Sequence, residues 1–169
     1  MWSTREADAQ PIINQSDVGD ISVTYVKEAG LWVALYDSLD PRGILARYAA
    51  YPWGPWSDEQ IIYEPSRETG YGVFIYDPTR KDNDKLAGPI NDPGSKVSET
   101  YGGFYAPYII DRFTRVANGQ ITLSWLMSTW NPYVVVRMET KLNVYAPEPA
   151  PAPVAVRTAD LPAGYGIEP

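Results

Sequence analysis

The sequence predicts an all-β protein built from antiparallel, four-stranded sheets. Short segments either alternate apolar and polar residues or stay apolar for a whole segment, which are the two patterns of β-strands. Turn signals containing Gly, Pro, Asn or Asp separate these segments, and the 169 residues contain no helix-period pattern of useful length. The aromatic fraction of 13% comes mostly from Tyr and Trp, which are favoured in strands.

The first group of strands is expected between residues 21 and 63. Turns at Glu28-Ala29-Gly30 and at 40–43 separate the first three of them. Four short antiparallel strands within about 45 residues match one blade of a β-propeller. The expected strands are Ile21–Tyr25, Leu31–Tyr36, Ile44–Ala49 and Gln60–Tyr63.

A second group is expected after a turn-rich connection at 64–100, in which only Val73–Tyr76 resembles a strand. Ala117-Asn118-Gly119 is a strong hairpin signal between two strands of this group. The pattern predicts three strands and no fourth, with a turn over Ser128–Tyr133. The expected strands are Phe104–Ile110, Ile121–Met127 and Tyr133–Leu142.

We therefore expect a folded region at 1–144, a partial propeller of about two blades and a long connection. Residues 145–169 begin with a Pro/Ala tract that cannot build a core, so we expect an extended or disordered tail. The amino terminus lacks the basic start and apolar core of a signal peptide. No run approaches the roughly 20 apolar residues that span a membrane.

Composition excludes several classes of function. The net charge is −7 and no Lys/Arg cluster occurs, which argues against nucleic-acid and membrane partners and favours a neutral ligand. The chain has no Cys and no His, so it cannot contain a Ser-His-Asp triad, a Cys-His pair or a His-ligated zinc. Acid–base chemistry must come from Asp and Glu, with Tyr or Lys as poorer candidates.

We expect no metal or other cofactor. Asp82-Asn83-Asp84 resembles the start of a calcium loop, but the glycine and the distal glutamate of an EF-hand are absent. Solvated loop charge is the simpler interpretation of these acids.

An ordered series of short motifs runs through the chain. Together these motifs resemble a family of β-propeller proteins, long catalogued as a domain of unknown function, that includes bacterial endo-D-arabinanases. The order and spacing of the motifs agree from about Trp2 to Leu142. The motifs are Gly19–Val23, Leu31–Tyr36, Arg47-Tyr48-Ala49, Pro52–Ser57, Tyr101–Phe104 and Ser128–Tyr133.

The resemblance implies a five-bladed propeller with a carbohydrate site at its central axis and hydrolysis of furanose glycans. It implies a poly- or oligosaccharide partner and an extracellular or cell-envelope location. Blades of about 40–50 residues require well over 200 residues for a whole ring, so this chain would supply only part of one. The resemblance places that part in the carboxy-terminal half. The sequence departs at two places: Asp20 stands where Glu is expected, and Tyr105-Ala106-Pro107 replaces a pattern with His before Pro.

Asp20 is the predicted catalytic carboxylate, because it opens the innermost strand of a blade close to the axis. The alternative is a turn residue that accepts hydrogen bonds from backbone amides. Asp37 and Asp40 flank a strand exit and are interpreted as turn formers. Glycoside hydrolysis needs two carboxyl groups facing a cleft.

The predicted substrate-binding residues are mostly aromatic and lie in or beside the motifs. Arg47 lies within a strand and is expected to be half buried and paired with a carboxylate, either structurally or to bind sugar. The aromatic residues could stack on sugar rings, whereas Trp56 and Trp130 could instead pack between blades. The candidates are Arg47, Trp53, Tyr105, Trp130 and Tyr133.

Two functions remain open: part of a glycan hydrolase, and a non-catalytic module that binds carbohydrate or protein. Two blades alone would leave sheet faces and strand edges uncovered, so we expect self-association or association with the missing amino-terminal blades. The large side chains expected to need such cover are those of Trp32, Tyr36, Trp125 and Met127.

Overall fold

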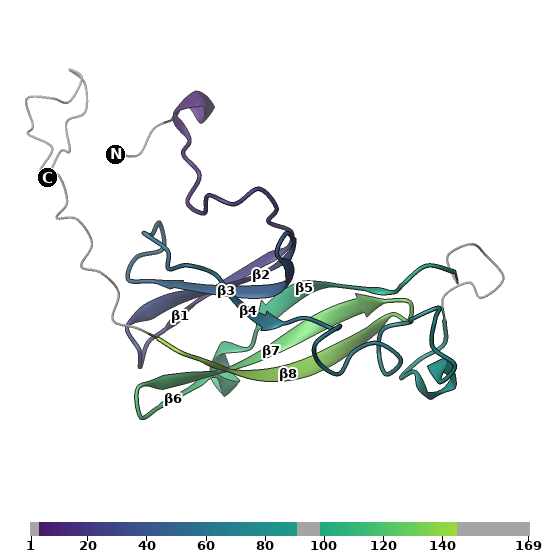
Figure 1. The fold of residues 1–169 in the computed structure, drawn as a ribbon. Helices are drawn as coiled ribbons and strands as arrows, with labels where there is room; N and C mark the ends of the chain where they lie inside the picture. The colour runs from purple at the N-terminus through teal and green to yellow at the C-terminus, as the bar shows by residue number, and fades with distance from the viewer. Residues whose placement is uncertain (1–3, 91–98, 145–169) are drawn as a thin grey trace, which may run out of the picture.

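The computed structural model describes residues 4–90 and 99–144, and it is all-β with two antiparallel, four-stranded sheets. Figure 1 shows the two sheets as layers, with β1–β4 above β7 and β8. Within the described residues neither sheet closes on itself. The predicted tail at 145–169 lies outside the described residues.

The first sheet has the order β1-β2-β3-β4, as the sequence predicts. Lys27–Gly30 forms the tight turn between β1 and β2, where Gly30 adopts φ 66°. The strands are β1 (Ile21–Val26), β2 (Leu31–Leu39), β3 (Arg42–Ala49) and β4 (Gln60–Tyr63).

The second sheet differs from the prediction because it contains a fourth strand. The first expected strand ends at Ile109, a turn of 3-10 helix follows, and the chain then forms β6. Both β5 and β6 pair with the edge of β7 that β8 leaves open, so β6 adds a strand without widening the sheet. The elements are β5 (Gly103–Ile109), η4 (Asp111–Phe113), β6 (Arg115–Ala117), β7 (Gln120–Trp130) and β8 (Val134–Leu142).

Two further expectations were wrong. Residues Ser128–Trp130 belong to β7, so the turn before β8 is confined to Asn131–Tyr133. Val73–Tyr76 is a turn with one isolated bridge between Tyr71 and Ile75, because Val73, Phe74 and Ile75 all direct their backbone amides to the carbonyl of Gly70. Short helices η1 (Glu6–Asp8) and η2 (Asn83–Lys85) also occur among the described residues.

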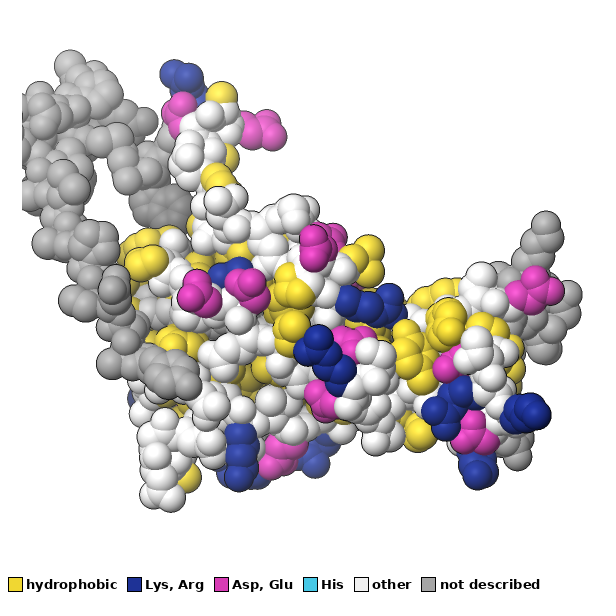
Figure 2. Space-filling model, viewed as in Figure 1, with side chains coloured by type: hydrophobic (Ala, Val, Ile, Leu, Met, Phe, Trp, Pro, Cys, Tyr) yellow, Lys and Arg dark blue, Asp and Glu magenta, His cyan; other side chains and the backbone are white. Residues whose placement is uncertain are grey.

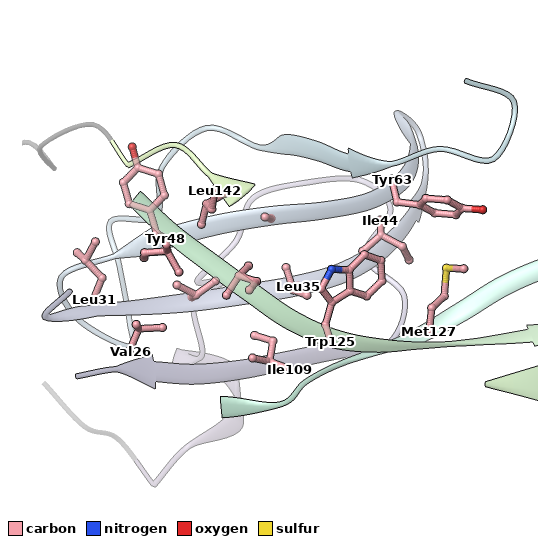
Figure 3. Close-up of a cluster of buried hydrophobic side chains, with 14 residues drawn as sticks. Val26, Leu31, Leu35, Ile44, Tyr48, Tyr63, Ile109, Trp125, Met127 and Leu142 are labelled. Atoms are coloured by element: carbon pink, nitrogen blue, oxygen red, sulfur yellow. The ribbon is translucent and has the colours of Figure 1, made fainter. Parts of the chain in front are cut away.

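The core lies between the facing surfaces of the two sheets. Leu35 and Ile44 of the first sheet meet Trp125 and Met127 of the second, and all four are fully buried. Figure 3 shows β7 crossing this face with the Trp125 ring directed at the first sheet. The Trp125 indole N–H donates to Thr140 Oγ1 at 3.1 Å, which satisfies its polar atom inside the core.

Four large side chains were expected to be uncovered in this chain alone: Trp32, Tyr36, Trp125 and Met127. The structure buries three of them. Trp125 and Met127 pack between the sheets. Tyr36 is buried on the other face of β2, where its hydroxyl donates to Gln15 Oε1 at 2.6 Å. Only Trp32 is half exposed. The amino-terminal segment therefore covers part of a face that the sequence predicted to be bare.

Candidate functional site

Asp37 is a carboxylic acid that the fold places between the two sheets. It lies within β2 rather than in a turn, because β2 continues to Leu39, and this corrects its interpretation as a turn former. In the antiparallel register it follows Tyr36 and pairs with Ile44, whose side chain belongs to the core. Its Oδ1 atom is buried and has no hydrogen-bond partner among the described residues. An unpaired buried carboxylate oxygen is costly and therefore rare.

Asp20 lies just before β1, and both Asp20 and Gly19 form backbone hydrogen bonds with Asp37. The Asp37 amide donates to the Asp20 carbonyl at 3.3 Å, and the Gly19 amide donates to the Asp37 carbonyl at 2.8 Å. The charge of Asp20 reaches the Asp37 carboxyl group, because it raises the pKa of that group. Gly19 is required beside them, because a Cβ atom there would overlap the Asp37 carboxylate.

The environment favours the protonated form of Asp37. Burial raises the pKa of its carboxyl group above the usual 3.8, and the charge of Asp20 raises it further. Backbone amides of Asp37, Asp20 and Ala106 oppose the rise. One carboxyl group is desolvated, and the other belongs to an exposed residue. Such a difference in environment lets one carboxyl group act as an acid and the other as a base.

Ala106 belongs to a bulge in β5. Residues Tyr105 and Tyr108 pair with Ser128 and Leu126, so three steps on β5 oppose two on β7. Ala106 adopts φ 48°, an unusual conformation for a residue with a side chain. The bulge breaks the ladder where β5 passes Asp37.

A groove of about 300 Å³ adjoins Asp37 where the first sheet meets the start of β5. We call it the inter-sheet groove. Its volume is at the lower end of the range for small-molecule sites. Gly103 lets the Trp130 indole lie close to the β5 backbone, because a Cβ atom at 103 would overlap that ring. The lining residues are Asp37, Ser38, Leu39, Arg42, Tyr101, Gly102, Gly103, Phe104 and Trp130.

Arg42 is the cation of the inter-sheet groove, and its guanidinium is held from three sides. It donates to the Tyr71 hydroxyl at 2.9 Å, lies 3.9 Å from the Glu64 carboxylate, and sits 5.4 Å from the centre of the Phe104 ring. Tyr71 in turn packs edge-on against Tyr101, with ring centroids 5.5 Å apart. The inter-sheet groove thus combines an acid, a fixed cation and aromatic walls.

The sequence profile of a family described as a domain of unknown function, DUF4185, matches residues 1–139. The chain belongs to the DUF4185 family. No curated protein shows a significant match to it. The family assignment agrees with the coarser part of the resemblance seen in the sequence.

The DUF4185 fold brings two of the predicted site residues to the inter-sheet groove. Trp130 lines it, and Asp20 adjoins it through its pairing with Asp37. Tyr133 follows Trp130 in the β7–β8 turn and is 68% exposed. Tyr105 pairs with Ser128, which places it on the face of β5 opposite the core. These four residues belong to the region around the start of β5.

Arg47 and Trp53 lie elsewhere. Arg47 is on the outer face of the first sheet, 12% exposed, and ion-paired to Glu59 at 2.6 Å, so the expected pairing with a carboxylate is confirmed. Its three nitrogens all donate to protein oxygens, including the Tyr36 hydroxyl and the Ser57 carbonyl. Trp53 lies in the β3–β4 loop, beyond the end of β3 that is remote from Arg42.

Asp37 and Arg42 are the site residues that sequence reasoning missed. Each stands next to a turn signal, where a polar residue is usually explained by the turn itself. Strand alternation could have identified Asp37, because it follows Val33 and Leu35 at period two and so lies on the same core-facing side of β2.

Two general findings concern the described residues as a whole. They contain no group of three or more His, Cys, Asp or Glu residues arranged to hold a metal ion. No helix within 4–90 and 99–144 has the length and apolar character needed to cross a membrane.

Asp82, from the calcium-like segment, forms a bidentate ion pair with Arg80 at 2.8 Å.

Proposed function

We propose that this chain is the carboxy-terminal part of a carbohydrate-active β-propeller of the endo-D-arabinanase type, with its substrate bound in the inter-sheet groove. The observation that carries the proposal is the pair of carboxyl groups, Asp20 and Asp37, beside a groove walled by Tyr101, Phe104 and Trp130. Aromatic faces suit the apolar faces of sugar rings. Two carboxyl groups are what glycoside hydrolysis requires.

In this proposal Asp37 is the general acid. Because its pKa is raised, it keeps its proton to a higher pH and can donate it to the oxygen of the departing sugar. Asp20 supplies the second carboxyl group, which either activates water or stabilises the developing positive charge. Arg42, fixed by Tyr71 and Glu64, binds a sugar hydroxyl at the edge of the groove.

The two sheets correspond in this proposal to two neighbouring blades, with β1 and β5 as the innermost strands. Ser22 Oγ on β1 lies 3.1 Å from the Ile109 amide of β5, so these two strands are adjacent. The remaining blades come from further polypeptide, either covalently linked or as a separate chain. The proposed location is extracellular or at the cell envelope, where glycans of this kind are found.

The test is release of reducing ends from arabinan by this chain and by a longer DUF4185 relative. Asp37→Asn and Asp20→Asn, and the matching substitutions in the relative, should each reduce the rate by about 100-fold or more, the usual contribution of a general acid or base. Asp40→Asn is the matched control, since Asp40 is an exposed acid three residues from Asp37. Full activity of both Asp37→Asn and Asp20→Asn would remove the pair from the mechanism.

The second candidate is a non-catalytic carbohydrate-binding or protein-interaction module. It is favoured by exposed aromatic side chains away from the carboxyl pair, above all Trp53, which is 61% exposed. Binding of the chain to immobilised arabinan without any release of product, by the chain or the longer relative, would support this candidate over hydrolysis.

A further inference from the structure

The loop between β3 and β4 presents an aromatic pair at the end of the first sheet remote from the inter-sheet groove. The rings of Tyr51 and Trp53 stack with centroids 5.4 Å apart and planes 10° from parallel. Both side chains are exposed, at 44% and 61%. Stacking uses one face of each ring, so large apolar surface remains in contact with water. Exposed aromatic surface of this kind marks binding sites more often than chance.

The loop that carries this pair is held in place by the backbone. The Gly54 amide donates to the Tyr51 carbonyl at 3.0 Å, which closes a turn around Trp53. The Ser57 amide donates to the Tyr48 carbonyl at 2.8 Å, and the Tyr48 amide donates to Ser57 Oγ at 3.1 Å. The two rings are therefore presented in a fixed arrangement, which lowers the entropic cost of binding a ligand.

The position of the pair separates it from the inter-sheet groove. Arg42, which lines the groove, begins β3, and Ala49 ends it. Eight residues of strand span roughly 23 Å. A second aromatic contact lies at the same end as the pair, because Trp32 pairs with Ala49 and also contacts Tyr25, with ring centroids 5.3 Å apart.

We infer that Tyr51 and Trp53 form a second carbohydrate-binding surface, which holds a neutral sugar ring of a polymeric glycan. The charge around the pair favours this ligand, since 50–58 contains no Lys or Arg and ends with the exposed Asp58. A nucleobase could also stack on these rings, but its phosphates would need nearby cations. A neutral ring offers C–H groups to the aromatic faces, and its hydroxyls donate to acceptors such as a carboxylate. The inference shares only the carbohydrate part of the proposed function and does not depend on hydrolysis.

Affinity electrophoresis in native gels containing arabinan, arabinogalactan or dextran tests this inference. At least one of these neutral polysaccharides should retard the chain, and Trp53→Ala should lose most of that retardation, a several-fold change in affinity. Tyr108→Ala is the matched control, because Tyr108 is an equally exposed aromatic on the outer face of the second sheet and its loss should change nothing.

The possible results separate this inference from the proposed hydrolysis. Loss of retardation in Trp53→Ala supports the inference whether or not the chain releases reducing ends from arabinan, so the two proposals can fail separately. Retardation of Trp53→Ala equal to that of the original chain overturns the inference, as does the absence of retardation by all three polysaccharides. Thermal unfolding of Trp53→Ala should match that of the original chain, because the side chain is mostly in water.

Discussion

The outer faces of the two sheets differ in chemistry although both sheets pack the same kind of core. On the first sheet, Ile21, Val23 and Tyr25 of β1 face away from the core and are each 43–48% exposed. On the second sheet, the corresponding face carries Arg137 and Glu139. Figure 2 shows basic and acidic side chains gathered along the β8 side of the molecule.

The difference lies in the exposed part of each outer face: β1 exposes apolar side chains, whereas β8 exposes charged ones. An antiparallel sheet with one solvated face alternates apolar and polar residues, as β8 does from Val136 onward. Val135 and Tyr108 are exposed apolar residues on the same outer face. The first sheet is apolar on both faces, and its one charged side chain near the middle, Arg47, is neutralised by Glu59. A contiguous apolar face of this kind marks a contact surface. We therefore expect contacts with other protein to involve the first sheet.

The largest expected effect is on self-association. We predict that the isolated chain forms dimers or larger species through the outer face of the first sheet, and that Val23→Lys together with Tyr25→Lys restores the monomer. The substitutions place charge on exposed positions and leave the core unchanged. Val135→Lys is the control, because Val135 is an even more exposed apolar residue on the outer face of the second sheet, and its substitution should not change the mass.

Sedimentation velocity with near-UV circular dichroism measures this outcome. A monodisperse monomer of the original chain with sharp, cooperative unfolding would contradict the prediction, and with it the interpretation of the chain as part of a larger ring. Loss of association in Val135→Lys as well would show that added charge alone, rather than the chosen face, disperses the chain.

The second effect is on the free energy of unfolding at Arg47. Arg47→Ala should lower it by about 3 kcal/mol, because the Tyr36 hydroxyl, the Ser57 carbonyl and Glu59 lose a charged partner inside a partly buried face. Arg47→Lys keeps the charge but cannot reproduce contacts from three nitrogens, so it should recover only part of the loss. Urea denaturation measures both. A loss below about 1 kcal/mol for Arg47→Ala would mean that this network is no stronger than a surface ion pair.

The sequence predicted the elements of this fold far better than its site. Strand alternation located both sheets, because core positions such as Leu35 and Trp125 recur at period two. It failed between β5 and β6, where the 3-10 turn Asp111–Phe113 leaves the edge of β7. The Thr114 hydroxyl there accepts a hydrogen bond from the Ser124 amide at 3.3 Å, in place of a backbone carbonyl. A side chain that substitutes for a ladder contact leaves no periodic signal.

The site depended on contacts that are distant in the sequence. Asp20 could be chosen from its place at the start of a strand. Asp37 could not, because its candidacy arises from the burial of one oxygen near Ala106 of β5 and from the nearby charge of Asp20. The separation of Trp53 from Trp130 likewise follows from strand direction and length, which the motifs alone do not specify.

A third, smaller effect concerns Asp37 and pH. Its folded pKa is raised, so the stability linked to its protonated form is fully present below the unfolded value of 3.8 and is lost as the pH rises through the folded pKa. Asp37→Asn should therefore be more stable than the original chain at pH 7, by about 1 kcal/mol, the low end of the cost of an unpaired buried polar group. This advantage should vanish below pH 3.8.

Thermal unfolding of Asp37→Asn and of the original chain over a range of pH tests this prediction. Asp82→Asn, measured in the same way, should change stability at pH 7 in the opposite direction. The hydrogen bonds and charge of Arg80 lower the pKa of Asp82, so its stabilising effect is present above pH 3.8 and is lost as the pH falls through the lowered folded value. Asp82→Asn should thus be less stable than the original chain at pH 7. An Asp37→Asn variant that is less stable at pH 7 would contradict the desolvated state of this carboxyl group.

The smallest effect is expected on the outer face of the second sheet, at the counterpart of Arg47. Arg115 lies 2.7 Å from Glu139, but its side chain is 62% exposed. Arg137 also lies within 3.5 Å of Glu139, so the carboxylate keeps a partner when Arg115 is removed. Arg115→Ala should therefore cost less than about 1 kcal/mol, and the cost should shrink further in high salt, which screens exposed pairs. Urea denaturation at low and high salt tests this. A cost comparable to that of Arg47→Ala would abolish the distinction between a solvated charged face and an apolar face that contains one enclosed ion pair.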